Sequence, residues 1–115
     1  MKRCIVKESK KEREFRHDTK VAFFRLLDDI AEVNLLDRNQ WDMIDFTLNE
    51  CRNSHHYDNE PGMSFEILVE NLYECKFPIT DKIYNEICRI GPRLGFAQDS
   101  WSFLQRLIAK SQPDA

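Results

Sequence analysis

The sequence has few glycines and prolines and no long apolar run. Three glycines and four prolines among 115 residues leave no glycine-rich loop that would cradle a phosphate. No stretch approaches the roughly 20 apolar residues that cross a bilayer. The only apolar run near the N-terminus, Cys4–Val6, is far shorter than the core of a signal peptide. We therefore expect a protein that stays in the cytoplasm.

The four cysteines lack the spacing of a metal site. They are Cys4, Cys51, Cys75 and Cys88, and no two of them form a CxxC pair. The cluster that most resembles a metal site consists of Cys51, His55, His56 and Asp58. A zinc site needs three or four convergent ligands, and no second ligand pair follows this cluster at a standard spacing. We expect free thiols, no metal and no cofactor.

Familiar catalytic motifs are missing as well. The sequence contains no GxGxxG, GxxxxGK[ST], HExxH or GxSxG pattern. A nucleophilic cysteine needs a depressed thiolate pKa and an oriented base, and nothing around the four cysteines indicates such a pair. We therefore expect no enzymatic activity and no small-molecule substrate.

Charge is distributed unevenly along the chain. Residues 1–16 carry seven Lys or Arg and three Asp or Glu, a net charge of +4, whereas residues 17–115 carry ten and seventeen, a net charge of −7. A basic arm therefore precedes an acidic body, which repels nucleic acid and favours a basic partner. Because the arm has one aromatic residue, Phe15, and no base-stacking pattern, nucleic acid is not the partner we expect.

Apolar residues recur at helical spacing. In five segments they recur three or four residues apart, as on one helix face, two of them with the full i, i+3, i+4, i+7 pattern, and no window shows the alternation of a strand. We predict an all-α fold, a compact bundle of about five short helices, in a single domain over residues 17–110. A charged arm at residues 1–16 precedes this domain, and a loose end at residues 111–115 follows it. The predicted core consists of Phe23, Ile30, Trp41, Ile44, Leu48, Phe65, Leu68, Leu72, Ile83, Ile87, Trp101 and Leu104.

Capping signals predict where the first two helices lie. The first is expected at residues 17–33, with Asp18 or Thr19 as its cap, since both side chains accept hydrogen bonds from free helix N–H groups. The second is expected to begin after an N-cap at Asn39. It should end just before residues 54–60, a polar segment that we predict to be a loop.

Prolines and a threonine mark the remaining helices. Pro61 suits the first turn of the third helix, which should end before Pro78. Thr80 is the expected cap of the fourth helix, and its proline predicts a kink or break at Gly91–Pro92. The expected C-cap of the fourth helix is Gly95, and the expected N-cap of the fifth is Asp99 or Ser100.

Acidic residues gather on the predicted second and third helices. Glu66, Glu70 and Glu74 recur every four residues, away from the apolar stripe of the third helix. Such a face either keeps the protein soluble or binds a basic partner, and the spacing leaves both interpretations open. The candidate partner-binding residues are Asp42, Asp45, Tyr57, Asp58, Glu60, Glu66, Glu70, Tyr73 and Glu74, with the two tyrosines as aromatic anchors.

A distinctive helix–turn–helix pattern occupies the second half of the chain. Its parts are the entry Glu60-Pro61-Gly62, the helix FEILVENLYE at residues 65–74, the turn KFPIT at residues 76–80, the Leu94-Gly95 end and Trp101. From Gly62 to Leu107 this pattern resembles the MafI-type bacterial immunity proteins, and the segment from Trp41 to Cys51 is similar to the family's preceding helix. The resemblance covers about two-thirds of the chain, while the basic arm and Pro92 depart from the family pattern.

This resemblance implies an inhibitor of a secreted or contact-delivered bacterial toxin, as in contact-dependent growth inhibition. Some toxins of such systems are EndoU-type ribonucleases, and ribonuclease active sites are basic because they hold phosphate. The acidic body matches such a target. We therefore expect an immunity protein that binds and neutralises a cognate toxin domain, with a basic nuclease as the partner. The alternative is a non-enzymatic helical adaptor or regulatory subunit whose basic arm contacts nucleic acid.

Overall fold

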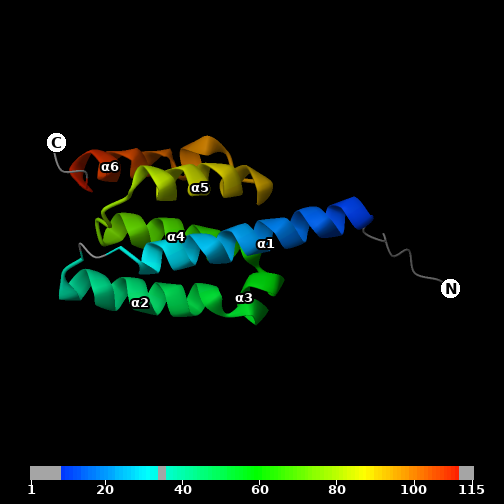
Figure 1. Cartoon of the computed structure of the whole chain (residues 1–115), viewed down its shortest axis with the longest axis horizontal. Helices are drawn as coiled ribbons and strands as arrows, with labels where there is room; N and C mark the ends of the chain where they lie inside the picture. The colour runs from blue at the N-terminus through cyan, green and yellow to red at the C-terminus, as the bar shows by residue number, and fades with distance from the viewer. Residues whose placement is uncertain (1–8, 34–35, 112–115) are drawn as a thin grey trace.

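The computed structural model describes residues 9–33 and 36–111, apart from the side chains of residues 54–56 and 109–111. Every regular element in these residues is helical, which confirms the predicted all-α fold. The longest helices are α1 (Lys10–Ala31), α2 (Arg38–Arg52), α4 (Pro61–Glu74) and α5 (Asp81–Arg93), and they run in alternating directions (Figure 1). The shorter elements are α3 (Ser54–Asn59), the 3-10 turns η1 (Gln98–Ser100) and η2 (Ser102–Leu104), and α6 (Gln105–Ser111).

The hydrophobic core lies between these helices. α1 packs against α2 and α5, and α4 packs against α2, α3 and η2. The predicted core residues are buried with one exception, Trp41. This residue is only partly buried because it lies in the first turn of α2, at one end of the bundle. Also buried in the core are Leu26, Leu27, Cys51, Tyr57, Val69, Phe77, Ile79, Tyr84, Ile90 and Leu107.

α1 begins earlier than predicted, at Lys10, because Ser9 and Glu12 form a capping box. The Ser9 hydroxyl accepts a hydrogen bond from the N–H of Glu12 (3.1 Å), and the Glu12 carboxylate accepts one from the N–H of Ser9 (2.8 Å). The predicted start at residues 17–19, with Asp18 or Thr19 as the cap, is therefore wrong. The Ser-x-x-Glu spacing of the true cap is visible in the sequence.

The predicted arm at residues 1–16 is partly helix. Residues 10–16 belong to α1, while residues 1–8 lie outside the described part of the chain. Side chains at residues 10–18 are all exposed, and this part of α1 extends beyond the other helices (Figure 1). This exposed part is helical because it continues a helix whose second half is packed, so the cost of helix nucleation is already met.

α2 is capped by Asp37 rather than by the predicted Asn39. The Asp37 carboxylate accepts a hydrogen bond from the N–H of Gln40 (2.8 Å), and the Gln40 side chain accepts one from the N–H of Asp37 (3.0 Å). The amide group of Gln40 also donates to the carbonyl of Cys75 (2.9 Å). This bond ties the start of α2 to the end of α4, so the two helices are antiparallel neighbours.

Residues 54–60 are not the predicted loop, because residues 54–59 form α3. Tyr57 explains the difference: its side chain is buried, and its ring centroid lies 5.1 Å from that of Phe23 and 5.6 Å from that of Phe24. Packing against α1 therefore stabilises a short helix that the polar local sequence does not predict.

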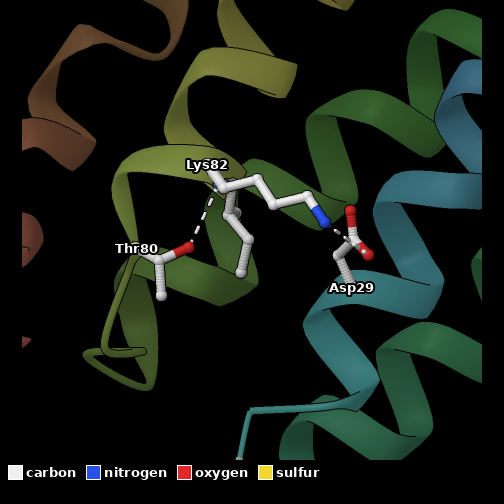
Figure 2. A network of polar contacts seen from close by, with 4 residues as sticks. Asp29, Thr80 and Lys82 are labelled. Atoms are coloured by element: carbon white, nitrogen blue, oxygen red, sulfur yellow. Dashed lines mark hydrogen bonds and ion pairs between the residues drawn. The ribbon is translucent and has the colours of Figure 1, made fainter.

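The predicted ends of α4 are confirmed. Pro61 lies in its first turn, and the helix ends at Glu74, before Pro78. The predicted cap of α5 is also confirmed, because the hydroxyl of Thr80 accepts a hydrogen bond from the N–H of Ile83 (3.1 Å; Figure 2). These boundaries depend on proline and capping chemistry, which acts locally and can be read from the sequence.

α5 does not break at Gly91–Pro92 as predicted. Pro92 lies in the last turn, where its missing N–H costs one hydrogen bond, and the helix continues to Arg93. The C-cap is Leu94 rather than Gly95. Gly95 follows it with a left-handed φ of 90°, and its N–H donates to the carbonyl of Pro92 (3.0 Å), which ends the helix.

The predicted helix start at Asp99 or Ser100 is wrong as well. The chain forms η1 and η2 there, and α6 begins only at Gln105. Trp101 separates the two turns with non-helical backbone angles (φ −138°, ψ −9°), and its ring is buried against Gly91 of α5. Packing of this ring, rather than local propensity, therefore shapes the connection.

Candidate functional site

Of the predicted acidic residues of α2, Asp45 lies on the side of the helix that faces α1. Asp42 and Asp45 are both exposed. Arg52 forms an ion pair with Asp28 of α1, with 2.9 Å between Nη1 and Oδ1, so this side of α2 faces α1. Asp45 precedes Arg52 by seven residues and therefore lies on the same side of the helix.

The predicted residues of α4 lie partly beside the 3-10 turns. Glu66 and Glu70 are exposed and line a small hollow of about 210 Å³ next to Phe103. Tyr73 is exposed and meets Phe103 edge to face, with 5.0 Å between ring centroids and an interplanar angle of 80°. Glu74 is exposed in the last turn of α4.

The remaining predicted residues surround the end of α3. Asp58 and Glu60 are exposed, and Asp58 Oδ1 lies 2.8 Å from Nζ of Lys20. Tyr57 is 3% exposed, so the prediction that it serves as a surface anchor is wrong. Burial raises the pKa of Tyr57 to about 12, with a smaller contribution from the charge of Asp58.

Phe46 is the feature of α2 that the sequence analysis missed. Its side chain is 67% exposed, more than any other large apolar side chain in the described residues. On the helix it lies between Asp42 and Glu50, each four residues away, and next to the exposed Met43, three residues before it. Because Phe46 lies opposite the apolar stripe of α2, its exposure was readable from the helical spacing.

α4 contributes to the same face. The side-chain amide of Asn71 donates to the hydroxyl of Thr47 (2.7 Å), which places the middle of α4 beside the middle of α2. Met43 lies one turn before Thr47, and Glu74 lies one turn after Asn71; since the helices are antiparallel, these two residues are neighbours along the seam. We define the Phe46 face as the exposed residues Asp42, Met43, Phe46, Glu50 and Glu74.

A second candidate site is a hollow of about 960 Å³ beside the N-terminal half of α1. Its other walls come from the chain between Tyr57 and Pro61 and from Arg93 and Leu94. We call it the basic hollow, because its charged lining residues are Lys11, Arg13, Arg16, Lys20 and Arg93 against Glu12 and Asp58.

Arg93 connects α5 to α1 across the basic hollow. Its guanidinium carbon lies 4.7 Å from the ring centroid of Phe15, and its Nη1 donates to the hydroxyl of Thr19 (3.3 Å). This hydroxyl in turn donates to the backbone carbonyl of Phe15 (2.8 Å). The fold thus brings a basic residue from the end of α5 onto the exposed aromatic ring of α1.

Two of the described cysteines, Cys51 and Cys75, lie in surroundings that disfavour thiol chemistry. Cys51 is buried, and its thiol donates to the carbonyl of Ser64 (3.5 Å). Burial raises the pKa of Cys51 to about 12 and that of Cys75 to about 11, which disfavours the thiolate needed for attack or metal binding. Among the described residues no three His, Cys, Asp or Glu side chains are grouped to hold a metal ion. The side chains of His55 and His56 lie outside the described residues.

Two carboxyl groups meet in the contact between α1 and α5. Glu86 is 9% exposed, and burial together with a hydrogen bond and the charge of Asp29 raises its pKa to about 7. Figure 2 shows Lys82 extending toward Asp29, with 3.5 Å between Nζ and Oδ1. This cluster supports the packing of two helices and opens onto neither candidate site.

Comparisons with known proteins add no relatives: no family model, no curated protein and no solved structure matches this chain. The resemblance to MafI-type immunity proteins therefore depends on the residues that suggested it. Among the described helices, none combines the length and the apolar character needed to cross a membrane.

Proposed function

We propose that this chain is an immunity protein that binds and neutralises a cognate secreted or contact-delivered bacterial toxin, with an EndoU-type ribonuclease domain as the target. The Phe46 face is the proposed binding surface. Two independent observations support the proposal: the resemblance of residues 62–107 to MafI-type immunity proteins, and the exposed phenylalanine flanked by carboxylates. The protein acts in this proposal by occupying its partner's surface and not by catalysis.

The exposure of Phe46 is the main observation that supports the proposed binding surface. Full burial of a phenylalanine side chain contributes about 1.5–3 kcal/mol, so a ring that is 67% exposed retains most of this free energy for a partner. Large apolar side chains at the centre of a patch, surrounded by polar groups, are typical of binding hot spots. Met43 enlarges the apolar centre, and the carboxylates of Asp42, Glu50 and Glu74 form the rim.

The sign of the rim favours a basic partner. The carboxylates of Asp42 and Glu50 beside Phe46, and of Glu74 beside Met43, are exposed, and residues 17–115 carry a net charge of −7. A nuclease domain presents positive charge around its active site because it must hold phosphate. Complementary charge steers the two proteins together, and the apolar centre keeps them bound.

The test compares the wild-type protein, one variant and one control variant in toxin binding and in inhibition of the toxin. Purified full-length protein is titrated against the toxin domain encoded beside its gene, and RNA cleavage by that domain is followed. Wild type should bind and block cleavage, and Phe46→Ala should weaken binding by about 30-fold or more, as a hot-spot loss of at least 2 kcal/mol implies. Val21→Ala removes another exposed apolar side chain, on α1, and should leave binding unchanged.

Two results contradict the proposal. If Phe46→Ala and Val21→Ala weaken binding to the toxin domain equally, the Phe46 face is not the binding surface, although the protein can still be an immunity protein. If the wild-type protein binds no nuclease domain, a nuclease toxin is not its partner. The runner-up, a non-enzymatic helical adaptor or regulatory subunit, is favoured in that case by the presence of two surfaces of opposite charge, the Phe46 face and the basic hollow.

A further inference from the structure

The basic hollow presents chemistry that the Phe46 face does not use. Five of its lining residues are positively charged and two are negatively charged. Asp58 is paired with Lys20, so these two charges offset each other, and Glu12 accepts a hydrogen bond from the N–H of Ser9. Four positive side chains then remain against one carboxylate. The hollow therefore has a surplus of positive charge in a chain whose overall net charge is −3. Such a surplus attracts an anionic ligand.

The positive groups are spread along α1 and around it. Lys11 and Lys20 are nine residues apart, or roughly 13–14 Å along the axis, and 3.6 residues per turn put them on opposite sides of the helix. Lys11 lies on the side of Phe15, four residues later, and Arg93 adds a positive group from α5 beside the same ring. A ligand with more than one negative group can contact both of them.

The hollow also contains an aromatic ring at its edge. Phe15 is 48% exposed, and the Arg93 guanidinium lies against its face. A planar ring stacked with arginine beside positive side chains is the combination that binds single-stranded nucleic acid, since bases stack on the ring while phosphates pair with the cations. An acidic peptide fits less well, because the other ring in the lining, Tyr57, is 3% exposed and leaves no deep apolar pocket for a side chain.

We infer that the basic hollow binds a short single-stranded nucleic acid, with phosphates on Lys11 and Arg93 and a base stacked at Phe15. The sequence alone argued against such a partner because the basic arm holds one aromatic residue. The fold changes the argument by bringing Arg93 onto that ring. The inference stands independently of the toxin partner, because it uses none of the residues of the Phe46 face.

The experiment measures fluorescence anisotropy of labelled single-stranded RNA and DNA oligonucleotides, about eight nucleotides long, titrated with the full chain. Affinity should fall with salt, with a slope of about −0.7 in log K against log salt for each neutralised phosphate. Lys11→Gln and Arg93→Gln each remove one phosphate contact and should each make the slope shallower by about 0.7. Phe15→Leu should weaken binding roughly 5- to 150-fold, as the loss of one stacked base implies.

Three controls separate the hollow from general charge. Arg25→Gln removes an exposed arginine of α1 outside the hollow, and Phe46→Ala removes an exposed ring elsewhere; both should bind like wild type. Poly-glutamate should compete poorly with the oligonucleotide. Circular dichroism confirms that each variant folds. The inference is overturned if wild type does not bind at low salt, if Arg25→Gln weakens binding as much as Arg93→Gln, or if poly-glutamate binds as tightly as RNA.

Discussion

At the scale of single residues, Glu86 makes the stability of the protein depend on pH. Its pKa is raised from the ordinary 4.5 to about 7 by burial and by the neighbouring Asp29, and the positive charges of Lys82 and Arg89 only partly oppose this. The folded state therefore holds the proton more tightly than the unfolded chain. The stabilising contribution is complete below pH 4.5 and is lost as the pH rises through about 7. We expect the free energy of unfolding in urea to fall between about pH 5 and pH 8.

A variant in which residue 86 cannot titrate isolates this effect. Glu86→Gln resembles the protonated form and should remove the fall in stability, so its advantage over wild type grows as the pH rises. Glu74→Gln changes an exposed glutamate and should keep the wild-type profile. If Glu86→Gln shifts the stability equally at every pH, Glu86 contributes through packing and the pair with Asp29 does not titrate as described.

At the scale of elements, the contact between α5 and the 3-10 turns requires a glycine. A Cβ atom at Gly91 would lie 2.3 Å from Cζ3 of the buried Trp101, which is far inside contact distance. Gly91→Ala should therefore destabilise the protein by about 1–3 kcal/mol, although alanine is favoured over glycine in a helix by about 1 kcal/mol. Urea unfolding followed by circular dichroism measures the difference.

Gly62 is a matched control for this substitution. It also lies in a helix, α4, but a Cβ atom there would lie 3.5 Å from the nearest side-chain atom, an ordinary contact with Phe96. Gly62→Ala should leave stability unchanged or raise it by up to about 1 kcal/mol. A Gly91→Ala protein as stable as wild type would show that Trp101 moves aside at little cost.

Sequence predicted some elements fully and others hardly at all. α4 was predicted at both ends because Pro61, its apolar stripe and Pro78 are local signals. α3 was missed because it depends on burying Tyr57 against α1, and the η1–η2 connection was missed because it depends on packing Trp101 against α5. Both depend on contacts between segments that are distant in the chain, which local propensity does not report.

Of the two candidate sites, one could be predicted from the sequence and the other could not. The exposure of Phe46 follows from its position opposite the apolar stripe of α2, so the sequence contained that information. The basic hollow was not accessible to sequence reasoning, because the contact between Arg93 and Phe15 joins two helices that are far apart in the chain. The exposure of a side chain on one helix is therefore easier to predict than a hollow formed between helices.

At the scale of the whole molecule, two surfaces of opposite sign lie on different elements. The Phe46 face belongs to α2 and α4, and the basic hollow to α1, α5 and the segment at the end of α3. The body carries a net charge of −7, so a basic partner is attracted over a distance of about one Debye length, roughly 8 Å at physiological salt. Which face the partner contacts then depends on where the negative charge is concentrated on the surface.

The carboxylates beside Phe46 either steer the partner toward this face or only keep the protein soluble. Asp42→Lys with Glu50→Lys reverses both charges that flank the ring. If they steer, the association rate with the basic toxin domain should fall about tenfold at low salt and approach the wild-type rate at 1 M salt, where screening acts within about 3 Å. The dissociation rate should change little, because exposed rim charges act mainly on association. Phe46→Ala should do the opposite and raise the dissociation rate.

Net charge alone has to be separated from charge at this position. Glu14→Lys with Asp99→Lys changes the net charge by the same amount at exposed residues of α1 and η1, away from the Phe46 face. If overall charge governs encounter, both double variants slow association equally. If the rim governs it, only Asp42→Lys with Glu50→Lys does so, because the local field at the contact determines the orientation of approach. If the association rate and its salt dependence are unchanged in both double variants, these carboxylates only keep the protein soluble. Binding then depends on Phe46 and Met43.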